Sequence, residues 1–486
     1  MKKAEITAFL SLTFVLLVSF VLGILEISII HTSKNMSRLK VDRAMFSVFG
    51  EYDAALMENY HIFAIEGSYG TGSYGEDHLT GRMQYYGAGG IEQKITGIQY
   101  LTDQGGQAFR EQVIRYMEEK YGISLIREFT GLTPQWEEQA LKAEEMEEKE
   151  KGILEGVDDL MEGAQAPSEN EDKIEEEISD EMADAENLTD GGPFTCIEKI
   201  EKSGILSVVM PADMELSGRK IDPGTQVSNR SLNTGEGVFP ARQGTGGPEE
   251  RLLFNEYILN TFSDAVSGKS QSEENSVPGG DAEDRSLAYE TEYILEGKSS
   301  DKENLESFLM KLFLVRMVLN YVYLMGDQAK QAEVSALAVA VTTALLIPEA
   351  AEVLKQLILL AWAGGESVVD IRALLSGKRA ALVKSSETWQ VSLSSLLTLG
   401  SGTEQIEGED VSGGIRYKDY LRVFLFLENT EDLNMRSLDR IEENMKTEYG
   451  MDYFRADQCI TKLETDNTAE ILGGITYSFP AYFGYE

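Results

Sequence analysis

The N-terminal end of the chain carries an uninterrupted apolar run that is long enough to cross a lipid bilayer. From Ala8 to Ile30 the only charged side chain is Glu26. About 20 apolar residues in a helix span the hydrocarbon core, and an ionisable group inside such a segment is costly enough to suggest a function. The run therefore predicts a transmembrane helix, and Glu26 becomes a candidate for assembly with another membrane helix.

The residues that flank the run favour an uncleaved anchor over a secretory signal peptide. Lys2 and Lys3 precede the run, which is longer than the ~7–15 apolar residues of a secretory signal, and no A-x-A cleavage site follows it. Basic residues also follow the run, and on charge alone they favour the reverse orientation. Because long domains translocate largely regardless of flanking charge, we expect a single-pass protein of the cell membrane. Its N-terminus is expected in the cytoplasm and its bulk outside.

The helix is predicted to continue past the apolar run as an amphipathic stalk, so that residues 1–60 form one region. Leu39, Phe46 and Phe49 recur at helical spacing and are expected to share one stripe. Two interpretations of this stripe stay open at this point. It packs on the protein's own domain, or it binds a partner.

The composition excludes several classes of partner. The 486 residues carry a formal net charge of −40, which repels the phosphates of nucleic acids and the headgroups of anionic lipids. Two cysteines, Cys196 and Cys459, are too few for a disulfide framework, and spacing alone does not decide whether they pair. The three histidines have no metal-ligand spacing. We therefore expect no nucleic acid, no metal, no cofactor, and we identify no small-molecule substrate.

Changes in composition divide the rest of the chain and predict an α+β fold that is predominantly helical. Residues 61–136 are predicted to form a small mixed α/β region, and residues 137–192 an acidic, partly disordered linker. Residues 193–486 are predicted to form a mainly helical ectodomain with a few strands. Gly- and Ser-rich loops are expected in it at 221–249 and 267–285.

Individual elements follow from periodicity and from breakers. The apolar stretch Ala336–Ile347 is too short for a second span and is predicted to lie in a buried helical hairpin, ended by Pro348. Two helices, Glu349–Ala363 and Glu366–Leu375, are expected after it. Five short apolar or alternating runs are predicted to be strands: Tyr60–Ile65, Ile95–Leu101, Ile205–Met210, Asp457–Leu463 and Gly473–Phe483.

The sequence lacks the common motifs of catalytic sites. The chain has no G-x-S-x-G nucleophile elbow, no P-loop, no H-E-x-x-H and no Cys-x-x-Cys. Gly70, Gly72 and Gly75 formally match G-x-G-x-x-G, but no clear βαβ unit surrounds them, so a loop is expected. Trp362 and Glu366 lie among helical apolar positions and are interpreted as core or cap residues. No catalytic residue is predicted.

The N-terminus resembles the start of TadE-like pseudopilins, which combine a short basic leader, an apolar helix and a Glu near the end of that helix. Lys3–Leu12 and Leu25–Glu26 carry the resemblance. It makes Ala4 the candidate position for processing. Type IV pilins place a Glu at the fifth position after the cleavage site, whereas cleavage after Ala4 would place Phe9 there.

Most of the chain outside the linkers resembles a bacterial family of unknown function. Its members are membrane-anchored and occur with tight-adherence (Flp-type) pilus and secretion genes. Six segments carry the resemblance: Phe49–Asp53, Glu290–Lys298, Ser300–Leu305, Leu360–Ala363, Asp370–Leu375 and Arg455–Ile460. The resemblance implies a role in pilus-like assembly at the cell envelope, with other pilus-assembly or pilin-like proteins as partners, and it implies no known activity.

Two functions are compatible with these observations. The first is a non-enzymatic, pilin-like or accessory component of a tight-adherence-type assembly, anchored by the N-terminal helix. The alternative is a membrane-tethered extracytoplasmic enzyme or ligand-sensing domain. A helix that continues unbroken from the membrane into the folded domain would favour the first function, and a cleft with convergent polar groups would favour the second.

Overall fold

The computed structural model describes residues 2–130, 195–211, 214–239, 247–267, 285–344, 348–396, 406–471 and 474–485. The acidic linker predicted at 137–192 and most of the loop predicted at 267–285 lie outside the described residues. Contacts group the chain into two compact units. The sheet unit comprises Met1–Lys120, Gly224–Glu250 and Thr430–Glu486, and the helical unit comprises Tyr121–Pro223 and Arg251–Asn429.

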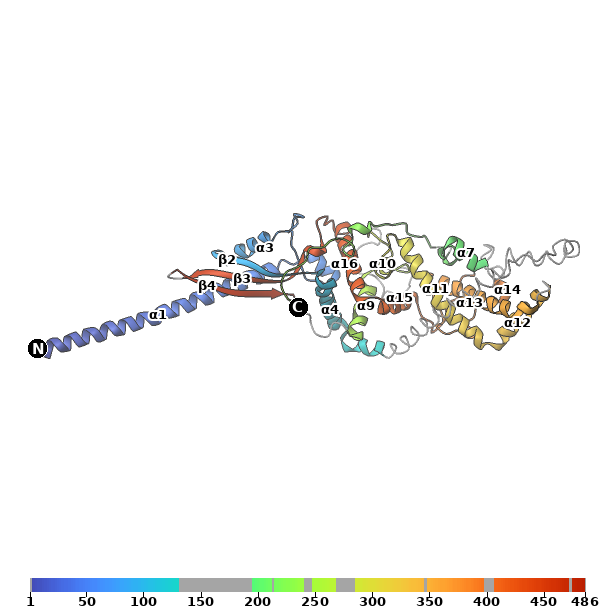
Figure 1. The fold of residues 1–486 in the computed structure, drawn as a ribbon, viewed down its shortest axis with the longest axis horizontal. Coiled ribbons are helices and arrows are strands. Elements are labelled where there is room, and N and C mark those ends of the chain that lie inside the picture. Colours follow the sequence, from blue (N-terminus) through green and yellow to red (C-terminus); the bar gives the residue numbers. More distant parts are fainter. Residues whose placement is uncertain are drawn as a thin grey trace. The chain divides into compact units, whose positions relative to one another are not determined.

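Helices predominate over one small antiparallel sheet, which confirms the predicted α+β class (Figure 1). The elements that begin in the sheet unit are α1 (Lys2–Phe49), α2 (Ala54–Tyr60), β1 (Ile65–Glu66), α3 (Glu76–Met83), η1 (Gln84–Ala88), β2 (Ile91–Tyr100), α4 (Asp103–Thr130), α9 (Pro248–Thr261), α16 (Thr430–Thr447), η6 (Ala456–Gln458), β3 (Cys459–Ile471) and β4 (Ile475–Gly484). Those of the helical unit are α7 (Thr195–Ser203), α8 (Leu206–Val209), η3 (Pro223–Thr225), α10 (Glu290–Glu296), α11 (Asp301–Gly326), α12 (Gln328–Ala344), η5 (Pro348–Ala350), α13 (Ala351–Leu375), α14 (Leu393–Leu396) and α15 (Tyr417–Leu427).

Helix α1 is one element of 48 residues that does not break where the apolar run ends. The most apolar window of α1 has a mean hydropathy of 2.6, and none of it is buried. By length and composition, α1 and α11 are the two described helices that could cross a membrane. In α11, 44% of the corresponding window is buried, as in the core helix of a soluble domain. The exposed apolar part of α1 is therefore the stronger candidate for a membrane anchor or a signal sequence.

The last turns of α1 pack on the sheet and supply much of its core. Their buried residues are spaced i, i+3, i+4, i+7 and i+8, which is one face of a helix: Val41, Ala44, Met45, Val48 and Phe49. Leu39 and Phe46 lie off this face and are 62% and 66% exposed. The single stripe expected for Leu39, Phe46 and Phe49 is thus divided. Three residues turn a helix by about 300°, which is enough to carry Phe49 from the exposed position of Phe46 to the edge of the buried face.

The sheet unit joins distant parts of the chain through its central strand, β3. Strand β2 pairs with one side of β3, and β4 and then β1 pair along the other side, all antiparallel. The strands predicted at Ile95–Leu101, Asp457–Leu463 and Gly473–Phe483 are confirmed as parts of β2, β3 and β4, with shifted ends. The prediction of a strand over Tyr60–Ile65 is largely wrong, because Tyr60 ends α2 and only Ile65 belongs to β1.

The core of the helical unit is built around α11 and α13, which pack against each other, with α12 on α13. The predicted hairpin is confirmed in outline, but α12 buries only one face, formed by Val334, Ala338 and Thr342, while Val339 is 54% exposed. The prediction of a strand over Ile205–Met210 is wrong, since this run contains helix α8. A short apolar run does not distinguish a buried strand from a buried helical turn, and Leu206, Val208 and Val209 are all buried.

Replacing Phe49 by alanine should destabilise the sheet unit, because its ring is 2% exposed and packs on the rings of Phe483 and Tyr485 at 4.7 and 5.0 Å. We expect a loss of ~3–5 kcal/mol, as for other buried aromatic side chains, measured by hydrogen exchange of the β3 amides. Leu39→Ala is the matched control on the exposed side of α1 and should cost less than about 0.5 kcal/mol. Equal effects would contradict this packing.

Candidate functional site

The residues predicted to act in the membrane all lie on α1, where the structure places them at different levels. Lys2, Lys3 and Ala4 form the first turn of the helix. The Glu26 side chain is exposed near the end of the apolar run. Among the described residues, none donates a hydrogen bond or an ion pair to the Glu26 carboxylate. The part of the chain that the structure describes therefore supplies no partner for this carboxylate.

Beyond the apolar run, α1 carries a second apolar surface that the sheet unit does not cover. Met36, Leu39 and Phe46, called here the outer stripe, are 51%, 62% and 66% exposed. Their spacing places them on one face of α1, opposite most of the buried residues. Only the edge of the Phe46 ring touches the sheet unit, with its centroid 5.8 Å from that of Phe483. The outer stripe is an exposed surface on a helix whose opposite face is fixed.

Two basic residues of α1 lie over aromatic rings of β4. The Lys34 Nζ is 4.9 Å from the centroid of the Tyr477 ring, and the Arg38 Cζ is 5.6 Å from the same centroid. Arg38 also lies 5.9 Å from the Phe479 centroid. Such cation–π contacts contribute about 0.5–1 kcal/mol each at exposed sites. They hold the start of β4 beside the part of α1 that follows the apolar run.

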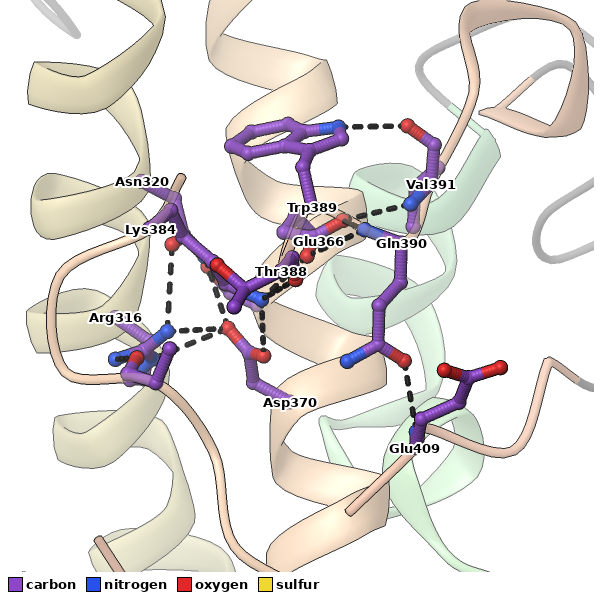
Figure 2. A network of polar contacts seen from close by, with 12 residues as sticks. Arg316, Asn320, Glu366, Asp370, Lys384, Thr388, Trp389, Gln390, Val391 and Glu409 are labelled. Atoms are coloured by element: carbon purple, nitrogen blue, oxygen red, sulfur yellow. Dashed lines mark hydrogen bonds and ion pairs between the residues drawn. The ribbon is translucent and has the colours of Figure 1, made fainter. Parts of the chain in front are cut away.

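The helical unit contains a buried network of four charged side chains (Figure 2). Arg316 projects from α11, Glu366 and Asp370 from α13, and Lys384 from the segment that follows α13; all four side chains are fully buried. The Lys384 Nζ lies 2.5 Å from Glu366 Oε1 and 2.7 Å from Asp370 Oδ1. The Arg316 Nη2 lies 2.5 Å from Asp370 Oδ2. Two cations thus face two carboxylates, and the network carries no net charge.

Neutral groups satisfy much of the remaining hydrogen-bonding capacity of this network. Arg316 Nη1 donates to the carbonyl of Ala381 at 2.8 Å. The amides of Gln390 and Val391 donate to Glu366 at 2.8 to 3.1 Å. Burial raises the pKa of Glu366, and the Lys384 ammonium opposes that shift. The network joins α11, α13 and residues 381–391 of the helical unit.

Trp362 and Glu366, interpreted from the sequence as core or cap residues, both lie in this region. Trp362 is 1% exposed and is a core residue. Its indole nitrogen donates to the carbonyl of Val391 at 2.8 Å, and Trp389 donates to the same carbonyl at 2.7 Å. Glu366 is not a helix cap but a member of the ion network. The signal for this role was present in the sequence as two carboxylates at i and i+4 in an apolar helix.

A second buried cluster lies around α10. Glu290 accepts hydrogen bonds from the backbone and hydroxyl of Ser263 and pairs with Arg285. Glu292 Oε1 accepts from the Tyr417 hydroxyl at 2.7 Å and from the amide of Ala265 at 2.9 Å, while its Oε2 is buried with no hydrogen-bond partner among the described residues. Burial, and then the neighbouring Asp264, raise the pKa of Glu292 to about 8. A protonated carboxyl fits this environment.

A third charged cluster lies in the sheet unit, around Arg230. Arg230 binds Glu442 of α16 at 2.6 Å and Asp457 of η6 at 2.7 Å. Arg455 also binds Asp457, at 3.0 Å. Burial opposes the ionisation of Asp457, but hydrogen bonds from Arg455, Asn233 and Arg230 lower its pKa overall. These contacts tie the loop after η3 to the C-terminal part of the chain.

The remaining sequence candidates do not form a catalytic or metal site in the described part of the chain. Gly70, Gly72 and Gly75 lie between β1 and α3, in a loop as predicted, and the Glu66 carboxylate accepts the amide of Gly70. Cys196 and Cys459 are both free and buried. Over the described residues, no group of three or more His, Cys, Asp or Glu side chains is arranged to hold a metal ion.

Comparison with known proteins identifies a family. The family model described as "Family of unknown function (DUF5702)" matches residues 183–471. The chain belongs to this family. The DUF5702 match covers the networks around Arg316, Glu292 and Arg230, and it begins after α1. No curated protein and no solved structure matches the chain.

Removing the Lys384 cation should destabilise the helical unit. Lys384→Met leaves two carboxylates to be balanced by Arg316 alone, and breaking a buried ion pair in this way costs ~3–5 kcal/mol. Urea unfolding followed by tryptophan fluorescence reports it, because Trp362 and Trp389 both donate to the carbonyl of Val391, whose amide donates to Glu366. The double variant Lys384→Met/Glu366→Gln restores charge balance and should recover part of the loss. A double variant no more stable than the single one would contradict the charge-balance argument.

Glu292 should make the stability of the helical unit depend on pH. The folded protein keeps a proton on Glu292 up to about pH 8, whereas the unfolded chain releases it near the ordinary value of 4.5. Raising the pH between these values should therefore lower the free energy of unfolding, by up to about 1.4 kcal/mol per pH unit. Glu292→Gln should flatten this slope in urea titrations. Glu352→Gln, whose side chain is 75% exposed, should leave the slope unchanged, and a slope that survives Glu292→Gln would refute the assignment.

Proposed function

We propose that this DUF5702 protein is a non-enzymatic, single-pass component of the cell envelope that acts by assembly. In this proposal α1 anchors the chain with its N-terminus in the cytoplasm and its bulk outside. Its partners are other pilin-like or pilus-assembly proteins of a tight-adherence-type system, as the resemblance of its N-terminus to TadE-like pseudopilins implies.

The observation that carries the proposal is the continuity of α1. The helix runs unbroken from Lys2 to Phe49, and its last turns are buried in the core of the sheet unit. A simple tether needs only a flexible connection between anchor and domain. A continuous helix instead transmits the position and rotation of the membrane segment to the folded unit, which suits a protein that packs side by side with others.

Two surfaces of α1 support assembly with a neighbouring helix. Glu26 places an uncompensated carboxylate within the apolar run, where an ionisable group usually pairs with another chain or group. The outer stripe of Met36, Leu39 and Phe46 continues the apolar surface of α1 beyond the run. They lie on different faces of the helix, because 20 residues at about 100° each turn Glu26 by about 160° away from Phe46, so each would meet its own neighbour.

The charged clusters favour assembly over catalysis. The side chains of Arg316, Lys384, Glu292 and Asp457 have at most a few per cent of their surface exposed or none at all. Their partners are other groups of the same unit. Such clusters stabilise a fold, whereas a catalytic group has to reach a substrate.

Glu26→Gln tests the proposal. The variant should insert normally, because removing a charge only eases insertion, but it should lose its partner, because the charge-assisted contact to a neighbouring helix is gone. The measurement compares the membrane abundance of the full chain with the proteins that co-purify from solubilised membranes.

Ser19→Ala is the matched control in the same apolar run. The Ser19 hydroxyl already donates to the carbonyl of Val15 within α1, at 2.8 Å, so its loss should leave co-purification intact. Unchanged co-purification of Glu26→Gln would make Glu26 a bystander and α1 only an anchor.

A further inference from the structure

The hairpin formed by β3 and β4 runs alongside α1 toward the apolar run (Figure 1). Both ends of this contact are fixed by side chains. The Phe483 ring packs on Phe49 at 4.7 Å, and the Tyr477 ring lies 4.9 Å from the Lys34 Nζ. The six residues from Tyr477 to Phe483 cover about 20 Å of strand, and the 15 residues from Lys34 to Phe49 cover about 22 Å of helix. The strand and the helix therefore cover about the same distance between these two contacts.

This alignment fixes the level that the hairpin tip reaches. Ile475 precedes Tyr477 by two residues, or about 7 Å of strand, which corresponds to between four and five residues of α1 at about 1.5 Å each. Counting back from Lys34 places Ile475 about level with Ile30, where the apolar run ends. The tip of the hairpin and the end of the apolar run thus lie at the same height.

The chemistry of the tip matches that of a membrane interface. Side chains alternate across a strand, so Ile471, Ile475 and Tyr477 share the face toward α1, whereas Glu470 and Thr476 lie on the other face. Ile475 is 41% exposed although it is apolar. Tyrosine is enriched at the headgroup level of membrane proteins, and the tip displays one there. Gly474, with φ of +75°, allows the chain to turn before β4.

Positive charge gathers at the same level. Lys34 and Arg38 follow the apolar run, and their contacts with the Tyr477 ring leave ammonium and guanidinium groups at its border. Lys40 and Arg43 lie further along α1, about 15 and 20 Å from the end of the apolar run, with Asp42 as the one acidic residue between Lys34 and Arg43. Basic groups next to a span attract the phosphates of anionic lipids, although the chain as a whole carries a charge of −40.

We propose that the hairpin tip, formed by Ile471, Gly474, Ile475 and Tyr477, rests in the headgroup layer of the bilayer that α1 crosses, with Lys34 and Arg38 binding lipid phosphate beside it. The sheet unit is then attached to the membrane at two places, the helix and the hairpin. This inference rests on the proposed membrane span of α1. It adds that the sheet itself touches the bilayer.

Site-directed spin labelling of the full chain in nanodiscs containing phosphatidylglycerol tests the inference. The measured quantity is the accessibility of a label to oxygen divided by its accessibility to a water-soluble nickel complex. This ratio should be several-fold greater for a label on Ile475→Cys than for a label on Tyr85→Cys. That ratio should place Ile475 within about 5–10 Å of the headgroup level. Tyr85 is 74% exposed and lies near Gly87, which packs on Arg43. Arg43 lies about 20 Å beyond the end of the apolar run along α1. The native cysteines are buried, so they take up label only if a variant unfolds, and Thr476→Cys is the second position if Ile475→Cys does so.

A label on Phe20→Cys separates the two proposals. If Phe20 is not in lipid, the membrane span fails and the hairpin proposal fails with it. If Phe20 is in lipid and the hairpin labels behave like the label at Tyr85, the span stands and the hairpin proposal is overturned. In the supporting outcome, Lys34→Gln/Arg38→Gln lowers the lipid contact of the Ile475 label while that of the Phe20 label is unchanged. An unchanged Ile475 label in this double variant would overturn the role of the two cations.

Discussion

The structure depends on one helix whose two halves have different surfaces. In its first half, α1 is apolar on all sides, which is stable in lipid, where every backbone group has to be bonded within the helix. In its last turns only one face is apolar, and that face is buried against the sheet. Because no residue between the two halves breaks the hydrogen-bond ladder, the two halves keep a fixed relation. The end of α1 is part of the core of the sheet unit, and no flexible linker separates the two.

Charge burial has a comparable role within the helical unit. Long apolar helices such as α11 and α13 pack without a strong preference for one register, since many apolar surfaces fit one another. Arg316 and Asp370 remove that freedom, because moving either helix by one turn would leave both charges buried and unpaired. Lys384 and Glu366 extend the same constraint to the segment after α13. We interpret the network as fixing which arrangement of the helices is adopted.

The sequence predicted individual helices and strands better than it predicted which of them pack or pair with one another. The apolar run predicted most of α1, and short apolar or alternating runs predicted parts of β2, β3 and β4. The break expected between Glu349–Ala363 and Glu366–Leu375 does not occur. Gly364 and Gly365 stay helical, both buried, with Phe313 and Ile197 close to Gly364. Tertiary packing there outweighs the low helix propensity of glycine.

The pairing of β2 with β3 joins residues more than 350 positions apart, which no local pattern can indicate. The charged networks were visible only as isolated charges in apolar stretches, without their partners.

The continuity of α1 also sets a helical phase. Each residue advances the helix by about 100°, so the direction in which Glu26 points is locked to the direction of the face that contains Val41 and Phe49. Adding or removing one residue between Ile30 and Lys34 would leave the apolar run, the sheet and the outer stripe intact. It would nevertheless rotate Glu26 by about 100° relative to the sheet. The number of residues in this segment, and not only their kind, is thus part of the information that the chain carries.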